Sequence, residues 1–335
     1  MYKYGIIGFG GLGKKHLCNL KAIEAQRGDI SLSAICGTTL EEAKKGVELN
    51  LGTVDVSNID FSSCNFYDDY KDMIEKENLD FVFSILPTYL HEEVALYALS
   101  KGLHVFSEKP MALTIDGCLK MIEASKENGK HLMIGQCLRF HSGYAKVKEY
   151  IDTKCFGNVR YATFERNSQM PLWTWNNWIL DDTKSGGCIF DMHIHDVDLI
   201  NYFFGKPNSI NGHVGNSKIK RESITSTYHY DNFKVDTRAD WSLPQTFPFK
   251  AICRIDFDEA SVVVENDRLS VYKDNETFYE DFDAEEAFVK EVSAFIELVI
   301  DSKECNITSP ESVADSIKMA YAEIESAKGS TQITL

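Results

Sequence analysis

The sequence predicts an α/β protein of two domains. We expect an N-terminal domain at about residues 1–125, built on a doubly wound parallel sheet, and a C-terminal α/β domain at about 126–335 with a large, mainly antiparallel sheet. Strand-like and helix-like segments alternate through the first third of the chain, as in a parallel sheet with helices on both faces. After about residue 155, short segments alternate polar and apolar residues, as in antiparallel strands with one covered face.

Each predicted element has a local signal. Apolar runs predict the first strands, and amphipathic stretches predict the helices. Some of these helices end at a glycine. In the first domain the expected strands are 2–7, 31–36, 80–86, 103–107 and 131–135, and the expected helices are 14–26, 40–51, 68–78, 91–101 and 114–128. In the second domain we expect strands at 158–166, 209–216, 223–230, 234–242, 250–256, 259–265 and 268–273, an acidic edge strand and loop at 274–286, and helices at 284–301 and 310–328.

A glycine-rich turn joins the first strand to the first helix. It reads Gly8-Phe9-Gly10-Gly11-Leu12-Gly13, which has the G-x-G-x-x-G spacing in the setting of a strand followed by a helix. In that setting Gly8 permits the tight turn, Gly10 lets the backbone approach a pyrophosphate, and Gly13 lets the helix lie close to the strand. The free N–H groups at the helix N-terminus would face the anion. The motif therefore predicts a Rossmann domain that binds a dinucleotide.

The residues after the second strand bear on which dinucleotide is bound. NAD sites usually carry Asp or Glu there to hold the ribose 2′-hydroxyl, but this strand runs into Gly37-Thr38-Thr39. The hydroxyls of Thr38 and Thr39 could donate to a 2′-phosphate, and Lys44 or Lys45 could reach it, although no arginine stands at the spot. The sequence favours NADP slightly and leaves NAD open.

The composition limits the classes of partner. The 335 residues are 44% hydrophobic and 26% charged, with a formal net charge of −16. This charge disfavours nucleic acid and anionic membranes, because both need a basic surface. The apolar runs are short, the chain enters a strand without an export signal, and nine cysteines include no C-x-x-C pair. These features favour a cytoplasmic protein with reduced thiols and no membrane span.

Two polar clusters lie where parallel strands end, which is the edge at which such sheets bind ligands. Leu86-Pro87-Thr88, with His91 behind it, follows one strand, and Glu108-Lys109-Pro110 ends the next. Lys109 is a candidate to hydrogen-bond a substrate hydroxyl or to stabilise developing charge. The alternative is a surface lysine paired with Glu108.

A third cluster follows the pair Gly186-Gly187. On a helix, Asp191, His195 and Asp198 share a face because they are four and three residues apart, whereas His193 points away. A histidine near carboxylates suits general acid–base catalysis close to neutral pH. Two alternatives stay open: a metal site made of all four side chains, or simple helix polarity and capping. We expect no metal.

The four tryptophans all lie in the second half of the chain. Aromatic faces stack on the C–H faces of sugars and inositols, so a carbohydrate-like substrate is attractive. Trp173 and Trp175, flanked by Pro171 and Asn176-Asn177, are candidates for a pocket loop that contacts the substrate. Core or interface packing is the alternative for each tryptophan.

Together these landmarks resemble the family of glucose–fructose oxidoreductase, inositol dehydrogenase and the rhizopine catabolism protein MocA. The resemblance covers nearly the whole chain, and its specificity lies in the order and spacing of the motifs. The matching segments are Gly8 to Gly13 with His16, Leu86-Pro87-Thr88 with His91, Gly102 to Pro110, Gln136-Cys137-Leu138-Arg139-Phe140, and Gly186-Gly187 leading to Asp191 and His195.

The resemblance implies roles for individual residues. Lys109 matches the lysine that touches both the nicotinamide region and the reacting hydroxyl. Asp191 and His195 match the pair that positions the substrate and moves its proton. Two departures from the family pattern are the missing acidic residue at Cys36-Gly37-Thr38, and His141 where proline or asparagine is often seen.

The matching segments also imply which other residues bind ligands. The glycine turn, Leu86-Pro87-Thr88 with His91, and Glu108 would join Lys109 in holding the cofactor. Arg139 would contact the substrate.

We therefore expect an enzyme that transfers a hydride reversibly between a nicotinamide cofactor and a hydroxyl carbon of a sugar, polyol or related small molecule. Two alternatives stay open: a glycosidase that keeps NAD bound and uses transient oxidation, and a non-catalytic sensor of cofactor or sugar with the same fold. Intact Lys109, Asp191 and His195 argue against the sensor. We also expect a homodimer or homotetramer in which one face of the second sheet forms a subunit interface.

Overall fold

The structure is a computed structural model that describes residues 1–49, 52–283 and 285–335. Its internal contacts divide the chain into two compact units. The first unit consists of Met1–Gly135 and Phe288–Pro310, and the second consists of Gln136–Ala287 and Glu311–Leu335. The division after Gly135, rather than near 125, keeps one further strand with the first sheet, and residues 288–310 return to the first unit.

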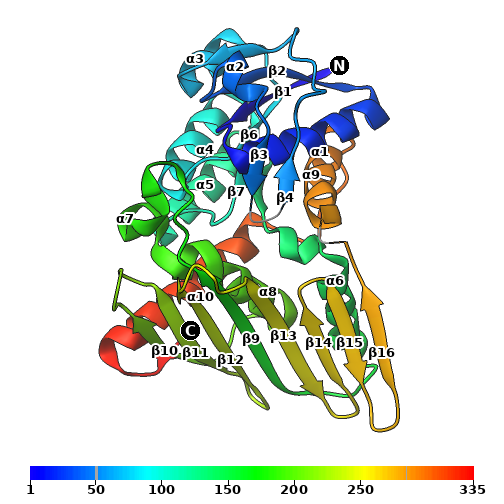
Figure 1. Cartoon of the computed structure of the whole chain (residues 1–335), viewed down its shortest axis with the longest axis vertical. Helices are drawn as coiled ribbons and strands as arrows, with labels where there is room; N and C mark the ends of the chain where they lie inside the picture. The colour runs from blue at the N-terminus through cyan, green and yellow to red at the C-terminus, as the bar shows by residue number, and fades with distance from the viewer. Residues whose placement is uncertain (50–51, 284) are drawn as a thin grey trace. The chain divides into compact units, whose positions relative to one another are not determined.

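The first unit is built on a six-stranded sheet in the order β5-β2-β1-β6-β7-β8 (Figure 1). All its pairings are parallel. The order reverses between β1 and β6, where sheets of this kind bind ligands. The doubly wound sheet is confirmed. Its strands are β1 (Tyr2–Ile7), β2 (Ile30–Cys36), β5 (Asn65–Tyr67), β6 (Phe81–Ser84), β7 (His104–Glu108) and β8 (Leu132–Gly135), and its helices are α1 (Gly11–Arg27), α3 (Tyr70–Lys76), η1 (Thr88–Leu90), α4 (His91–Ser100), α5 (Ile115–Glu127) and α9 (Glu285–Ile300).

The predicted helix at 40–51 is wrong. Helix α2 covers only Leu40–Ala43, and a hairpin of β3 (Val47–Leu49) and β4 (Gly52–Val54) follows it. Gly46 weakens the helix at this point, and the β-branched Val47 favours the hairpin that pairs it with Val54. Residues 50–51 of the predicted helix lie outside the described residues.

The return segment belongs to the first unit because of aromatic packing. Phe295 of α9 contacts Phe81, Phe83 and Phe106 of the sheet, with ring centroids 5.5–5.9 Å apart. The neighbouring Val292 is also fully buried. Contacts of this kind between distant parts of a chain carry no local sequence signal, so the return was not predicted.

The second unit is built on a nine-stranded sheet in the order β16-β15-β14-β13-β9-β12-β11-β10-β17. Its pairings are antiparallel except that between β12 and β9, so the mainly antiparallel sheet is confirmed. The strands are β9 (Val159–Gln169), β10 (Ser209–Gly215), β11 (Ser223–His229), β12 (Lys234–Leu243), β13 (Lys250–Phe257), β14 (Ser261–Glu265), β15 (Arg268–Tyr272), β16 (Thr277–Asp281) and β17 (Ile333–Thr334). The helices are η2 (Cys137–Phe140), α6 (Ser142–Thr153), η3 (Trp175–Leu180), α7 (Asp182–Ser185), η4 (Ile189–His193), α8 (Ile194–Phe204) and α10 (Pro310–Gly329).

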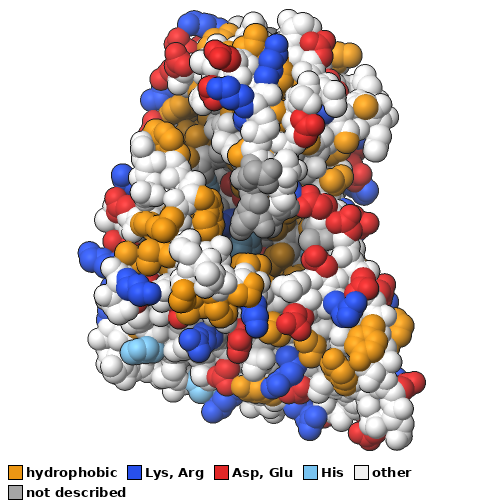
Figure 2. Space-filling model, in the orientation of Figure 1, with side chains coloured by type: hydrophobic (Ala, Val, Ile, Leu, Met, Phe, Trp, Pro, Cys, Tyr) orange, Lys and Arg blue, Asp and Glu red, His pale blue; other side chains and the backbone are white. Residues whose placement is uncertain are grey.

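Helices α6, α8 and α10 cover one face of this sheet, behind the strands in Figure 1. The other face mixes charged and hydrophobic side chains, as Figure 2 shows. On that face the hydroxyls of Tyr161 and Thr227 both donate to Asp236, each at 2.5 Å. No helix among the described residues is long and apolar enough to span a membrane.

Candidate active site

The glycine turn between β1 and α1 has the geometry that its spacing predicts. Gly8 has a φ of +92°, and a Cβ there would lie 2.1 Å from the carbonyl oxygen of Ile85. A Cβ on Gly13 would lie 2.4 Å from the carbonyl oxygen of Gly8, so α1 packs against the end of β1 at a distance that only glycine allows. A Cβ on Gly10 would meet nothing within 4 Å among the described residues. Gly10 therefore faces open space, as an approach to a ligand requires.

The N-terminus of α1 suits an anion. Gly10 is the N-cap residue, and the first turn contains no acidic side chain. The N–H groups of Gly11, Leu12 and Gly13 have no partner within the helix, because the first N–H groups of any α-helix lack one. With the positive end of the helix dipole they fit the pyrophosphate of a dinucleotide.

The loop after β2 offers no carboxylate at Gly37. Thr39 accepts a hydrogen bond from the backbone N–H of Glu42 and so caps α2, while Thr38 donates to the carbonyl oxygen of Thr39 at 3.4 Å. Lys14 of α1 donates to the carbonyl oxygens of Glu42 and Lys45 at 2.8 and 2.6 Å. An ammonium group thus lies beside this loop. Its position was not predicted, because Lys14 is distant from the loop in sequence.

The loops after β6 and β7 are tied together by His91. This buried ring contacts the carbonyl oxygen of Pro110 through Nδ1 at 2.7 Å and that of Leu86 through Nε2 at 2.8 Å. Burial lowers the pKa of His91, so the neutral ring donates only one of these bonds at a time. In these two loops, Thr88 is buried, and Lys109 is half-buried at the carboxyl end of β7.

Glu108 connects the site to the core of the first unit. Its carboxylate contacts Nε2 of His16 at 2.8 Å and accepts the backbone N–H of Lys109 at 3.1 Å. Burial alone would raise the pKa of Glu108, but the hydrogen bond and charge of His16, together with Lys109, lower it. Glu108 thus remains ionised and fixes the turn that carries Lys109.

In the second unit, the segment with Asp191 and His195 begins as a π-helical turn, η4, and continues as α8. Of residues 188–200, only Asp191 and His195 keep partial exposure, and all the others are buried. The two candidate catalytic side chains therefore share the accessible side of this segment. Single π-helical turns are frequent at functional sites.

His193 points into the core, as the sequence predicts in placing it away from the other two. Its Nε2 contacts Glu323 of α10 at 3.0 Å, and its Nδ1 lies 3.7 Å from Asp196, which also binds Arg166. Burial acts to lower the pKa of His193, but Glu323 and Asp196 raise it to about 9. Tyr228 also donates to Glu323 at 2.7 Å, so His193 belongs to a buried polar network.

Arg139 and Asp198 form a buried ion pair. The guanidinium donates twice to the carboxylate, at 2.7 Å each, and Ser316 donates to the same carboxylate at 2.8 Å. This arrangement removes Asp198 from the accessible face on which it was predicted to join Asp191 and His195. It also directs the guanidinium of Arg139 into the second unit, where both side chains are about 2% exposed.

Of the four side chains in the metal alternative, His193 contacts Glu323 and Asp198 is paired with Arg139. Among the described residues, one group of three possible ligands is close enough for a metal ion, and it contains His16, Glu108 and Glu291 rather than the Asp191 cluster.

The exposed fractions of Trp173 and Trp175 are 52% and 72%. Both rings are thus exposed, that of Trp173 just before η3 and that of Trp175 at its first residue, whereas Trp241 is buried.

These features define a two-domain protein with a dinucleotide-binding Rossmann unit and a second unit that presents an aspartate–histidine pair. Family models match most of the chain: residues 2–136 match an oxidoreductase family with an NAD-binding Rossmann fold, and residues 144–278 match the GFO/IDH/MocA C-terminal domain. The chain belongs to the GFO/IDH/MocA family of oxidoreductases, which confirms the resemblance drawn from its motifs.

Curated relatives match part of the chain. An oxidoreductase of Streptococcus pneumoniae without an assigned substrate is 33% identical over 137 residues, which cover 40% of this chain and 36% of the relative. An inositol 2-dehydrogenase/D-chiro-inositol 3-dehydrogenase of Halalkalibacterium halodurans is 30% identical over 204 residues, covering 60% of this chain and 52% of the relative. These alignments thus span about a third to a half of the relatives' lengths.

Solved structures match over the whole chain. Levoglucosan dehydrogenase in complex with NADH and levoglucosan has a TM-score of 0.84 at 18% identity, covering 99% of both chains. The myo-inositol 2-dehydrogenase of Lactobacillus plantarum has a TM-score of 0.79 at 22% identity, covering 100% of this chain and 99% of the other. At such identities the similarity establishes the shared fold.

Proposed function

We propose that this protein is an NAD(P)-dependent dehydrogenase or reductase that acts on a CH–OH group of a sugar, polyol or related small molecule. Lys109, Asp191 and His195 are its catalytic residues. The observation that carries the proposal is the selective exposure of Asp191 and His195 in an otherwise buried segment, because a merely structural helix would gain nothing from presenting this pair.

The proposed chemistry divides the work between the cofactor and the chain. When bound, the nicotinamide supplies the hydride acceptor or donor. His195 removes the proton from the substrate hydroxyl during oxidation and returns it during reduction, which contributes about 10²- to 10⁴-fold in rate. Lys109 donates a hydrogen bond to the same oxygen and stabilises its developing negative charge. Asp191 orients the substrate and the imidazole.

The substrate class is supported by two features. Trp173, just before η3, and Trp175, its first residue, present exposed rings in the second unit, where they can stack on the C–H face of a ring-shaped polyol. Family members that match this chain are named as inositol and levoglucosan dehydrogenases. Their substrates are polyhydroxylated rings.

We propose a slight preference for NADP over NAD. Gly37 leaves the ribose region without the carboxylate that repels a 2′-phosphate. The ammonium of Lys14 lies beside this loop and can attract that phosphate after exchange of its bonds to the carbonyls of Glu42 and Lys45. Thr39 caps α2, so Thr38 is the more available of the two hydroxyls.

We further propose a cytoplasmic homodimer or homotetramer. The face of the nine-stranded sheet opposite α6, α8 and α10 carries paired polar groups as well as apolar side chains (Figure 2), a composition suited to a subunit interface. Mass measurement by light scattering tests this proposal, and a monomer at micromolar concentration would contradict it.

The decisive experiment for the function is a panel of sugars, inositols and other polyols assayed with NAD and NADP. With at least one substrate, we expect a net increase in the absorbance of the reduced nicotinamide. We expect the Lys109→Met variant to lose this increase. Hydrolysis of a glycoside without net cofactor reduction would instead identify the glycosidase alternative. Tight cofactor binding without turnover of any compound would favour the sensor.

A further inference from the structure

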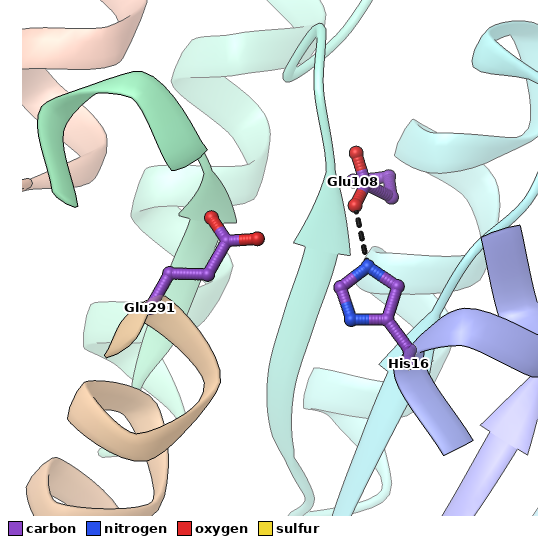
Figure 3. Close-up of side chains that lie close together, drawn as sticks. All are labelled: His16, Glu108 and Glu291. Atoms are coloured by element: carbon purple, nitrogen blue, oxygen red, sulfur yellow. Dashed lines mark hydrogen bonds and ion pairs between the residues drawn. The ribbon is translucent and has the colours of Figure 1, made fainter. Parts of the chain in front are cut away.

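A buried cluster in the first unit is not used by the proposed chemistry. It consists of His16 of α1, Glu108 of β7 and Glu291 of α9 (Figure 3). One possible ligand atom of each residue lies within 4.8 Å of the others, and the exposed fractions are 0%, 5% and 0%. In Figure 3 the carboxylate of Glu291 points toward the other two side chains, which are joined by their hydrogen bond.

Glu291 lies in apolar surroundings. Phe288 and Phe295 flank it on the buried side of α9, and His16 packs edge-to-face on Phe288 and on Phe106, at 6.1 and 5.7 Å between ring centroids. Neither carboxyl oxygen of Glu291 has a hydrogen-bond partner among the described residues. An ionised carboxylate in such a place is costly, so it must take up either a proton or a cation.

The neighbouring groups indicate which of the two carboxyls is ionised. Glu108 already accepts hydrogen bonds from His16 and from the backbone N–H of Lys109, and both stabilise its negative charge. Within the part of the chain that the structure describes, Glu291 has no such donor, and it faces the charge of Glu108. Burial, and then the charge of Glu108, raise the pKa of Glu291 well above its usual range. When two interacting carboxyl groups lie in different surroundings, one commonly stays ionised while the other keeps its proton.

We propose that Glu291 carries a proton at neutral pH and shares it with Glu108 through one bridging water, and so acts as a positioning residue for Lys109. The proton and this water complete a hydrogen-bonded chain from Glu291 through Glu108 to the backbone of Lys109. The positioning role rests on the proposed function of Lys109, whereas the protonation itself does not.

Other charged groups near the cluster are few among the described residues. On α1, Lys15 lies over the ring of Phe288, with Nζ 4.9 Å from the centroid, and His16 faces the carboxyls. On β7, Glu108 faces Glu291 and is followed by Lys109. A proton on Glu291 leaves one carboxylate in the cluster, which the hydrogen bonds from His16 and from the backbone N–H of Lys109 stabilise. A divalent cation bound by two ionised glutamates would also offset the negative charge, so the test must separate these cases.

The first test measures the proton directly. Infrared difference spectra of the whole protein at pH 7 should show the carbonyl band of a protonated carboxylic acid, which disappears in Glu291→Gln. Glu297→Gln, on the same helix but half-exposed and paired with Lys303, is the matched control and should retain the band. Absence of the band from the wild type would overturn the proposal. So would a stoichiometric divalent metal that survives dialysis and is lost in Glu291→Gln.

The second test uses the pH dependence of unfolding. The folded state keeps a proton that the unfolded chain releases above pH about 4.3, so each unit of rising pH should favour unfolding of the wild type by up to about tenfold relative to Glu291→Gln, until Glu291 ionises in the folded state. The Gln variant is therefore expected to gain stability relative to wild type between about pH 5 and 7. Equal slopes for the two proteins would contradict a protonated Glu291.

The third test concerns Lys109. Glu291→Gln keeps a neutral hydrogen-bond donor and should preserve kcat and KM, whereas Glu291→Leu should lower kcat by about tenfold, the value of one lost hydrogen bond, with the cofactor Kd unchanged. If Glu291→Leu folds and keeps the wild-type kcat, the positioning role is wrong. If the wild type shows no dehydrogenase activity, the proposed function fails, while the infrared and unfolding tests still decide the protonation.

Discussion

The sharpest test of the cofactor site is Gly10→Val. Gly10 has a φ of −75° and a ψ of −161°, an extended conformation that valine adopts without strain. Apart from Gly10 and its chain neighbours, no described residue has an atom within 4 Å of the position of its Cβ. The substitution should therefore change the free energy of unfolding by about 1 kcal/mol or less, the order of an N-cap change.

The same side chain would occupy the space through which a pyrophosphate approaches α1. Overpacking of this kind costs about 1–3 kcal/mol, which corresponds to roughly 5- to 150-fold in Kd. Calorimetric titration with NADH and NADPH measures the loss, and thermal unfolding confirms that the variant is folded. Gly13→Ala is the comparison: its Cβ would lie 2.4 Å from the carbonyl oxygen of Gly8, so it should lower the unfolding temperature as well. Undiminished affinity in a folded Gly10→Val protein would refute the assignment.

Three further predictions follow from the two units. Lys109→Met and His195→Ala should each reduce turnover by about 10²- to 10⁴-fold in steady-state assays while cofactor titrations stay close to wild type; an equal loss of cofactor affinity would assign them to binding instead. His193→Ala should act on stability, lowering the free energy of unfolding by about 3–5 kcal/mol because it leaves the buried carboxylate of Glu323 without its cationic partner. Since the pKa of His193 is raised to about 9 in the folded state, this contribution is fully present below pH about 6.5 and is lost as the pH rises through 9, which denaturant titrations at several pH values can follow. NADPH should bind the wild type at least as tightly as NADH, and Gly37→Asp should shift the preference toward NADH, with some loss of stability from its φ of +90°; a wild type that strongly prefers NADH would contradict this reasoning.

Much of the fold could be predicted because its signals are local. The glycine turn, the alternation of strands and helices, and the polar–apolar alternation after residue 155 depend on neighbouring residues. The prediction of a helix at 40–51 was wrong because it followed a short amphipathic run and gave too little weight to Gly46 and Val47. The hairpin depends on the pairing of Val47 with Val54, and the amphipathic pattern of one segment does not reveal such a pairing.

The candidate site was only partly predictable, because several of its contacts join distant segments. Arg139 and Asp198 are 59 residues apart, and no spacing rule links them. The π-helical turn at Ile189–His193 departs from the helical period on which the shared face was predicted. Glu291 did leave a signal, since it lies three residues after Phe288 and four before Phe295 in the apolar stripe of a helix. A glutamate in such a stripe indicates either a protonated acid or a paired charge.

The central claim is that this chain catalyses hydride transfer at a hydroxyl-bearing carbon. The most direct measurement uses the polyol that gives the strongest response in the substrate panel, deuterated at its reacting carbon, with mass spectrometry of the reduced cofactor. We predict one deuterium per reduced nicotinamide and the loss of this transfer in His195→Ala. Product formation with no deuterium in the cofactor would contradict the claim.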